Sequence, residues 1–266
     1  MKIIISHLKA MLWFAIYLCS QVAVMLLFMI ISLFKSQELL NNFINGTDEQ
    51  VTLATNEILK STTIPTLLIS SIIIILIFII YLNIKKNKSE VLNSIGYQKI
   101  IKYMLIAMIA NLSIGIAISF IPESQYTNNL TDSVSLALSG NFVLVLISTG
   151  ILTPILEEII FRFGIGNNLL KINKYYALII QAIIFGIMHG NLIQGTYAFC
   201  LGLIFGYVDL KEKSLLPSII MHITINSSSV ISAFLPINES ITLLGITTII
   251  LILYTVCKNI ESKKTI

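Results

Sequence analysis

The chain has 266 residues, of which 56% are hydrophobic and only 11% are charged, and its mean hydropathy is +0.91. Soluble globular domains carry about 25% charged residues, so this chain has too few charges to cover a water-facing surface. The composition therefore excludes a soluble enzyme, a nucleic-acid-binding protein and a disordered chain. The net charge of +4 by itself indicates little about function, whereas the positions of the charged residues along the chain are informative.

Eight apolar segments are candidate membrane spans. A helix needs about 20 apolar residues to cross the hydrocarbon core of a bilayer, and a lone strand in lipid would leave its backbone groups unpaired. We therefore expect an all-α fold, a polytopic integral membrane bundle of about eight transmembrane helices. The segments run over Ala10–Phe34, Ile64–Ile84, Ile100–Ile121, Phe142–Phe161, Tyr175–Gly190, Gly195–Val208, Leu215–Leu235 and Ile241–Cys257.

The distribution of basic residues predicts the orientation of the bundle. If the N-terminus is cytoplasmic, all of the 17 basic residues except Lys35 and Lys60 fall on the cytoplasmic side, including those between Lys85 and Lys102. Cytoplasmic loops carry an excess of lysine and arginine. We therefore expect a multi-pass protein of the cell membrane with both termini in the cytoplasm. The longest polar segment between spans, residues 35–63, is expected to be an external loop.

The first half of the chain carries no recognisable motif. Its spans contain no acidic residue, and Cys19, Cys200 and Cys257 lie in apolar runs without the spacing of a disulfide framework or a thiolate metal site. We divide the chain into N-terminal transmembrane helices without motifs (residues 1–140), a transmembrane core that holds the candidate catalytic residues (141–257) and a cytoplasmic tail (258–266).

Ionisable side chains inside membrane spans are costly and are functional candidates by default. Such residues are concentrated in the second half of the chain. They are Glu157, Glu158 and Arg162 on the fourth span, His189 on the fifth and His222 on the seventh.

Helical spacing separates the two neighbouring glutamates. Glu158 and Arg162 stand four residues apart with the acid first, which is the favoured order for an ion pair on one helix. Glu157 points about 100° away from this pair, so it has no partner on its own helix and is free to act as a general base.

The same spacing places further polar residues together. His222 and Asn226 share one helix face, as do Phe185 and His189. A chain reversal near Asn173 would bring His189 to the same height as Glu157, at 1.5 Å per residue.

The polar residues described above form three spaced patterns, and together these patterns resemble the motifs of one family. Residues 157–162 (EEIIFR) have the form Glu-Glu-x-x-x-Arg, residues 185–189 (FGIMH) have the form Phe-x-x-x-His, and residues 222–226 (HITIN) have the form His-x-x-x-Asn. In this order they resemble the CAAX protease and bacteriocin-processing (Abi) family of intramembrane glutamic endopeptidases. One departure is Phe163, where the family commonly has glycine.

The resemblance implies an eight-helix membrane protease with a polar cavity that opens to the cytoplasm. In such an enzyme Glu157, aided by His189, activates water for attack on a peptide carbonyl, and His222 and Asn226 stabilise the oxyanion. The resemblance gives orienting roles to Glu158, Arg162 and Phe185.

The same resemblance implies a membrane-associated peptide or protein as the substrate, and no cofactor. Bacterial members of the family are associated with bacteriocin maturation, self-immunity or peptide-signal systems, so these are the expected biological roles.

Two other functions are compatible with the sequence. Glu157, His189 and His222 could instead bind zinc, which would then activate the water. Alternatively, the chain could be a non-catalytic immunity protein or a transporter whose buried charges bind its cargo.

Overall fold

The computed structural model describes residues 1–85, 91–235 and 238–262, and every regular element in these ranges is a helix. The all-α prediction is therefore confirmed for the described part of the chain. In order the elements are α1 (Lys2–Lys35), α2 (Gln37–Asn45), α3 (Asp48–Lys85), α5 (Tyr97–Ser119), α6 (Gln125–Ala137), α7 (Phe142–Val145), η1 (Leu146–Leu152), α8 (Thr153–Glu158), η2 (Ile159–Gly166), α9 (Asn167–Leu170), α10 (Lys174–Ile187), α11 (Leu192–Glu212), α12 (Leu216–Phe234) and α13 (Glu239–Ser262).

Within the described residues, five helical stretches are long and apolar enough to cross a membrane, namely Lys2–Lys35, Asp48–Lys85, Tyr97–Ser119, Phe142–Leu170 and Leu192–Glu212. The chain is thus a multi-spanning membrane protein. Helices α10, α12 and α13 occupy the other three predicted spans, but α10 has only 14 residues. The number of eight membrane-spanning helices stays a prediction. The side chain of Cys257 lies outside the described residues.

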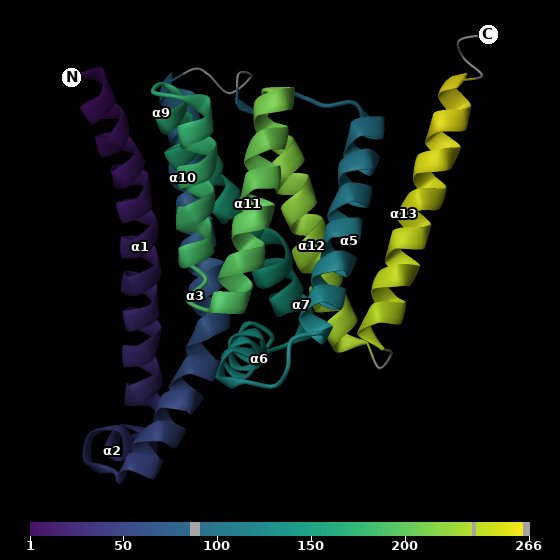
Figure 1. Cartoon of the computed structure of the whole chain (residues 1–266). Coiled ribbons are helices and arrows are strands. Elements are labelled where there is room, and N and C mark those ends of the chain that lie inside the picture. The colour runs from purple at the N-terminus through teal and green to yellow at the C-terminus, as the bar shows by residue number, and fades with distance from the viewer. Residues whose placement is uncertain (86–90, 236–237, 263–266) are drawn as a thin grey trace.

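The first turn of α1 and the last turn of α13 lie at the same end of the bundle, at the top of Figure 1. This arrangement agrees with an even number of crossings, while the side of the membrane that this end faces stays a prediction. Residues 86–90 of the predicted cytoplasmic segment between Lys85 and Lys102 lie outside the described residues, as do residues 263–266 of the predicted tail.

The expectation that residues 35–63 form a loop is wrong, whereas their external position stays a prediction. The segment folds into α2 and the first turns of α3, with Ser36 capping α2 by accepting a hydrogen bond from the amide of Leu39. Leu39 packs against Ala54 and Ile58 of α3. Because these apolar residues recur at helical spacing, they give an otherwise polar segment a face to bury.

The N-terminal helix α1 packs closely on the fourth membrane segment. A Cβ atom at Gly164 would lie 2.7 Å from the Cβ of Trp13, so this close approach requires glycine at position 164. The ring of Phe163 packs edge-on against Trp13, Phe78 and Tyr81. The non-glycine residue at position 163 thus contributes an aromatic contact between α1, α3 and η2.

The fourth membrane segment is irregular around the candidate site. Two π-helical stretches, η1 and η2, flank the short helix α8 that carries both glutamates. Pro154 lies in the first turn of α8 and cannot donate a backbone hydrogen bond. π-Helical turns inside helices are frequent at functional sites.

At the end of the bundle opposite the first turn of α1, α6 lies across the other helices (Figure 1). The side-chain amide of Asn191 donates to the carbonyl of Tyr126 at 3.2 Å, and the hydroxyl of Thr149 donates to the carbonyl of Ala137 at 3.1 Å. These two contacts tie both ends of α6 to segments that adjoin the candidate site.

Candidate active site

The predicted ion pair on the fourth membrane segment is present. Arg162 Nε lies 2.9 Å from Glu158 Oε2, and the two side chains are 2% and 0% exposed. The guanidinium also lies over the ring of Phe185, 4.4 Å from its centroid, where the negative face of the ring attracts the cation. Phe185 therefore supports the pair from a neighbouring helix.

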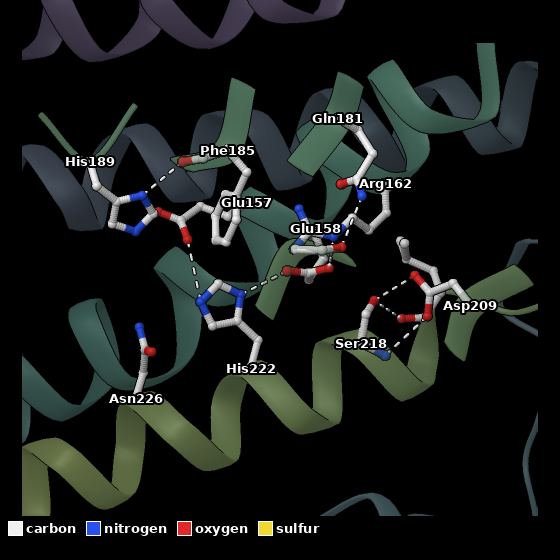
Figure 2. Close-up of polar contacts among 12 residues, drawn as sticks. Glu157, Glu158, Arg162, Gln181, Phe185, His189, Asp209, Ser218, His222 and Asn226 are labelled. Atoms are coloured by element: carbon white, nitrogen blue, oxygen red, sulfur yellow. Dashed lines mark hydrogen bonds and ion pairs between the residues drawn. The ribbon is translucent and has the colours of Figure 1, made fainter. Parts of the chain in front are cut away.

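His222 connects the two glutamates. Its Nδ1 lies 2.7 Å from Glu158 Oε1, and its Nε2 lies 3.4 Å from Glu157 Oε2 (Figure 2). Glu157 has no partner on its own helix, as predicted, but it has this one on α12. Because Arg162 pairs with Glu158, the Glu158 carboxylate can accept a hydrogen bond from His222 Nδ1.

His189 lies beside this pair, just beyond the end of α10. Its Nδ1 donates to the carbonyl of Phe185 at 2.8 Å, and its ring stands edge-on to the Phe185 ring. A neutral imidazole that donates through Nδ1 has a lone pair on Nε2. In Figure 2 the side chains of His189 and Glu157 point into the same space, which agrees with the predicted hairpin around Asn173.

Asn226 lies one turn beyond His222 on α12, with its amide directed toward the same region (Figure 2). Its Nδ2 donates to the carbonyl of Thr149 at 3.2 Å. The neighbouring Ser227 hydroxyl donates to the carbonyl of Gly150 at 2.9 Å. These bonds fix α12 against η1, and one N–H of the Asn226 amide is left for a ligand.

The sequence analysis missed one acidic residue of this cluster. Asp209 on α11 accepts hydrogen bonds from the Ser218 amide at 3.1 Å and from the Ser218 hydroxyl at 2.6 Å. Ser218 stands one helical turn before His222 on α12. The predicted sixth span ended at Val208, whereas α11 continues to Glu212. The one signal in the sequence that could have indicated Asp209 was its position directly after an apolar run.

A cavity of about 260 Å³ lies near the end of the bundle where α1 begins. Its lining includes Arg162, Gln181 and Asp209, together with Lys213–Leu215 from the turn between α11 and α12. Glu157 and the two histidines do not line it. This cavity reaches Arg162 of the buried ion pair but not Glu157, the predicted general base. It therefore differs from the cavity that the family resemblance implies.

The zinc alternative receives no support from this geometry. Within residues 1–85, 91–235 and 238–262, no group of three or more His, Cys, Asp and Glu side chains is arranged to hold a metal ion. Both ring nitrogens of His222 face glutamate oxygens, so His222 and Glu157 form a donor–acceptor pair.

The fold and the site define a class: a multi-spanning helical membrane protein with glutamate and histidine side chains clustered inside the bundle. Residues 139–228 match the family model described as "Type II CAAX prenyl endopeptidase Rce1-like". This segment contains all three motifs, so the match confirms the resemblance.

A protein of Bacillus subtilis (strain 168) named "Putative membrane peptidase YdiL" is 31% identical over 118 residues. The match covers 44% of this chain and 46% of that protein, so it spans about half the length of this curated relative. No solved structure matches the chain significantly.

Proposed function

We propose that this protein is an intramembrane glutamic endopeptidase that hydrolyses a peptide bond of a membrane-associated peptide or protein. The observation that carries the proposal is the position of His222 between the two glutamates. It leaves Glu158 neutralised by Arg162 and places Glu157 beside a group that can share its proton. The match of residues 139–228 to an endopeptidase family supports the same reaction.

The proposed reaction begins with a water molecule held by Glu157. Glu157 takes a proton from the water as its oxygen attacks the peptide carbonyl carbon, and His189 Nε2 helps to orient the water. His222 and Asn226 donate hydrogen bonds to the oxygen of the tetrahedral intermediate. Glu157 then returns the proton to the leaving amine as the carbon–nitrogen bond breaks.

Glu158, Arg162 and Phe185 act through these residues and do not touch the substrate. Arg162 holds Glu158 as a carboxylate, and Glu158 fixes the orientation of the His222 ring. We also propose the division of the chain into helices 1–140, a catalytic core 141–257 and a tail 258–266. The start of the family match at residue 139 agrees with the first boundary.

The proposed biological role is maturation of a bacteriocin or a peptide signal, or self-immunity against such a peptide. Prenylated proteins are a further substrate class to test, because the family model is that of prenyl endopeptidases.

The test is cleavage of labelled membrane-associated peptides by the purified full-length protein in detergent. Wild type should cleave with or without a chelator, whereas Glu157→Ala should not cleave. Glu38→Gln, a change to an exposed glutamate of α2, is the matched control and should behave as wild type. Equal cleavage by Glu157→Ala and wild type would refute the assignment of Glu157 as the general base. Loss of wild-type cleavage on chelation, with recovery on zinc addition, would replace the glutamic mechanism by a zinc mechanism. A peptide that is bound but never cleaved would indicate an immunity or transport protein.

A further inference from the structure

Three lysines from distant parts of the chain meet at the end of the bundle where α1 begins. Lys2 and Lys9 lie on α1, and Lys171 lies in the turn between α9 and α10. With Ile5 and Ser6 they line a cavity of about 270 Å³, which we call the lysine pocket. None of the described residues that line it is acidic. The pocket is separate from the candidate active site.

The packing of α1 holds the lysines together. Lys2, Ser6 and Lys9 share one face of α1 because they are spaced four and three residues apart, and Ser6 is only 3% exposed. His7 Nε2 lies 3.0 Å from the hydroxyl oxygen of Tyr176 on α10. The pocket is thus formed by tertiary contacts between α1 and the segment that matches the peptidase family.

The positive charges in the pocket repel one another. Lys171 Nζ donates to Asn168 Oδ1 at 3.2 Å, and this acceptor is neutral. Burial, and then the charges of Lys9 and Lys2, lower the pKa of Lys171 below its ordinary value. The folded protein therefore disfavours the charged form of Lys171. An anion in the pocket would offset this cost.

We propose that the lysine pocket binds the phosphate of an anionic membrane lipid. The three ammonium groups supply hydrogen-bond donors and positive charge for phosphate oxygens. The pocket lies at the first turns of α1 (Lys2–Lys35), where a membrane-spanning helix would leave the hydrocarbon core and meet lipid headgroups. Ile5, Leu8 and Leu12 of α1 are 43%, 59% and 60% exposed, and they offer an apolar surface along which an acyl chain can lie. A soluble phosphate ion has no acyl chain that could contact this apolar surface.

This assignment explains how α1 stays attached to the family core. A headgroup held by Lys2, Lys9 and Lys171 would bridge α1 and the turn between α9 and α10. Trp13 and Gly164 join the same two parts of the chain deeper in the bundle. The lipid would therefore supply a second stabilising contact between α1 and the rest of the bundle, at the membrane surface.

Native mass spectrometry of the full-length protein, with phosphatidylglycerol or phosphatidylcholine of identical acyl chains, tests the proposal. Wild type should retain one phosphatidylglycerol molecule at concentrations where phosphatidylcholine is lost. A lysine near an anionic headgroup contributes about fivefold in affinity. The triple variant Lys2→Gln, Lys9→Gln, Lys171→Gln should therefore lose about a hundredfold.

A matched triple variant controls for net charge. Lys102→Gln, Lys174→Gln and Lys211→Gln remove three exposed lysines from α5, α10 and α11 at the same end of the bundle. This variant should keep the affinity of wild type. An equal loss in both triple variants would overturn the proposal in favour of general surface charge, and equal retention of the two lipids by wild type would overturn it directly.

A thermal measurement keeps the test independent of how well the triple variant folds. In neutral detergent, Lys171→Gln should unfold no earlier than wild type, because it removes a repelled charge. Added phosphatidylglycerol should raise the wild-type midpoint more than that of Lys171→Gln. Equal protection of both proteins would contradict the proposal. Equal protection of wild type by millimolar inorganic phosphate would assign the pocket to a soluble anion. These readouts do not involve peptide cleavage, so their failure leaves the proposed function untouched.

Discussion

The side chain of Asn226 donates to the carbonyl oxygen of Thr149, a group that Pro154 leaves without a backbone donor. Thr153 makes a π-helical hydrogen bond to the carbonyl of Ser148. The next such bond, from residue 154 to Thr149, cannot form because proline has no N–H. The corresponding α-helical bond, from residue 154 to Gly150, is lost for the same reason. Asn226 and Ser227 satisfy these two carbonyls from α12.

This relationship predicts the effect of Pro154→Ala. The alanine amide would compete with Asn226 and Ser227 for the carbonyls of Thr149 and Gly150, so α12 would lose part of its anchorage beside the site. We expect peptide cleavage to fall by about tenfold or more, without an earlier thermal unfolding. Cleavage rates and unfolding midpoints measured on the same preparations check this. An unchanged rate would show that the proline does not set the position of Asn226.

The two glutamates should respond differently to substitution. Glu158→Gln leaves the Arg162 charge without its partner in a buried place, which costs about 3–5 kcal/mol, so the amount of folded protein should fall. Glu157→Gln should leave folded protein nearly unchanged and abolish cleavage. Membrane abundance by immunoblotting and cleavage per mole of folded protein separate the two effects. The assignment fails if Glu158→Gln is as abundant and as active as wild type.

The proposed oxyanion donors should affect catalysis more than binding. Asn226→Ala should slow cleavage by roughly 10²–10³-fold, the usual loss for one such donor, with little change in KM. His222→Ala should be at least as severe, because it also removes the partner of Glu157. Steady-state kinetics on one peptide measure both constants. A pure rise in KM for Asn226→Ala would indicate a substrate-binding role instead.

Asp209 should act as a positioning residue for α12. Its two hydrogen bonds from Ser218 hold the first turn of the helix that carries His222 one turn later. Asp209→Ala and Ser218→Ala should each lower kcat by about tenfold or more. In a double-mutant cycle on unfolding, their coupling energy should be about 1–3 kcal/mol.

Conservative and matched variants give this prediction a sharper test. Ser218→Thr keeps the hydroxyl and should retain more activity than Ser218→Ala. Ser113→Ala, at an exposed serine of α5 that donates to the carbonyl of Ile109 on its own helix, should leave kcat unchanged. Additive losses in the Asp209–Ser218 cycle would show that the two residues act separately.

The predicted orientation can be tested by cysteine labelling of intact cells. In a chain whose own cysteines have been replaced, a cysteine at Asp48 should react with an impermeant reagent. A cysteine at Lys211 should react only after the membrane is permeabilised, because positively charged ends stay in the cytoplasm. Reaction at Lys211 in intact cells would reverse the orientation of the bundle.

The sequence alone determined the class of fold and the local pairings. Its apolar segments required helices, since an isolated strand cannot satisfy its backbone in lipid. The Glu158–Arg162 pair followed from a separation of four residues, because that spacing fixes which side chains meet on one helix. The order of the three motifs was likewise sufficient to indicate the family.

Only the tertiary structure decided which side chains meet between helices. Spacing along α12 places His222 and Asn226 on one face, but the packing of α12 against α8 and η1 determines that His222 joins both glutamates and that Asn226 satisfies Thr149. Asp209 and the lysine pocket depend on contacts between segments far apart in the chain. The helical fold of residues 35–63 depends on burial of Leu39 against α3. In each case the partner is set by how helices are rotated and packed against one another, and a periodic pattern within one helix carries no information about that rotation.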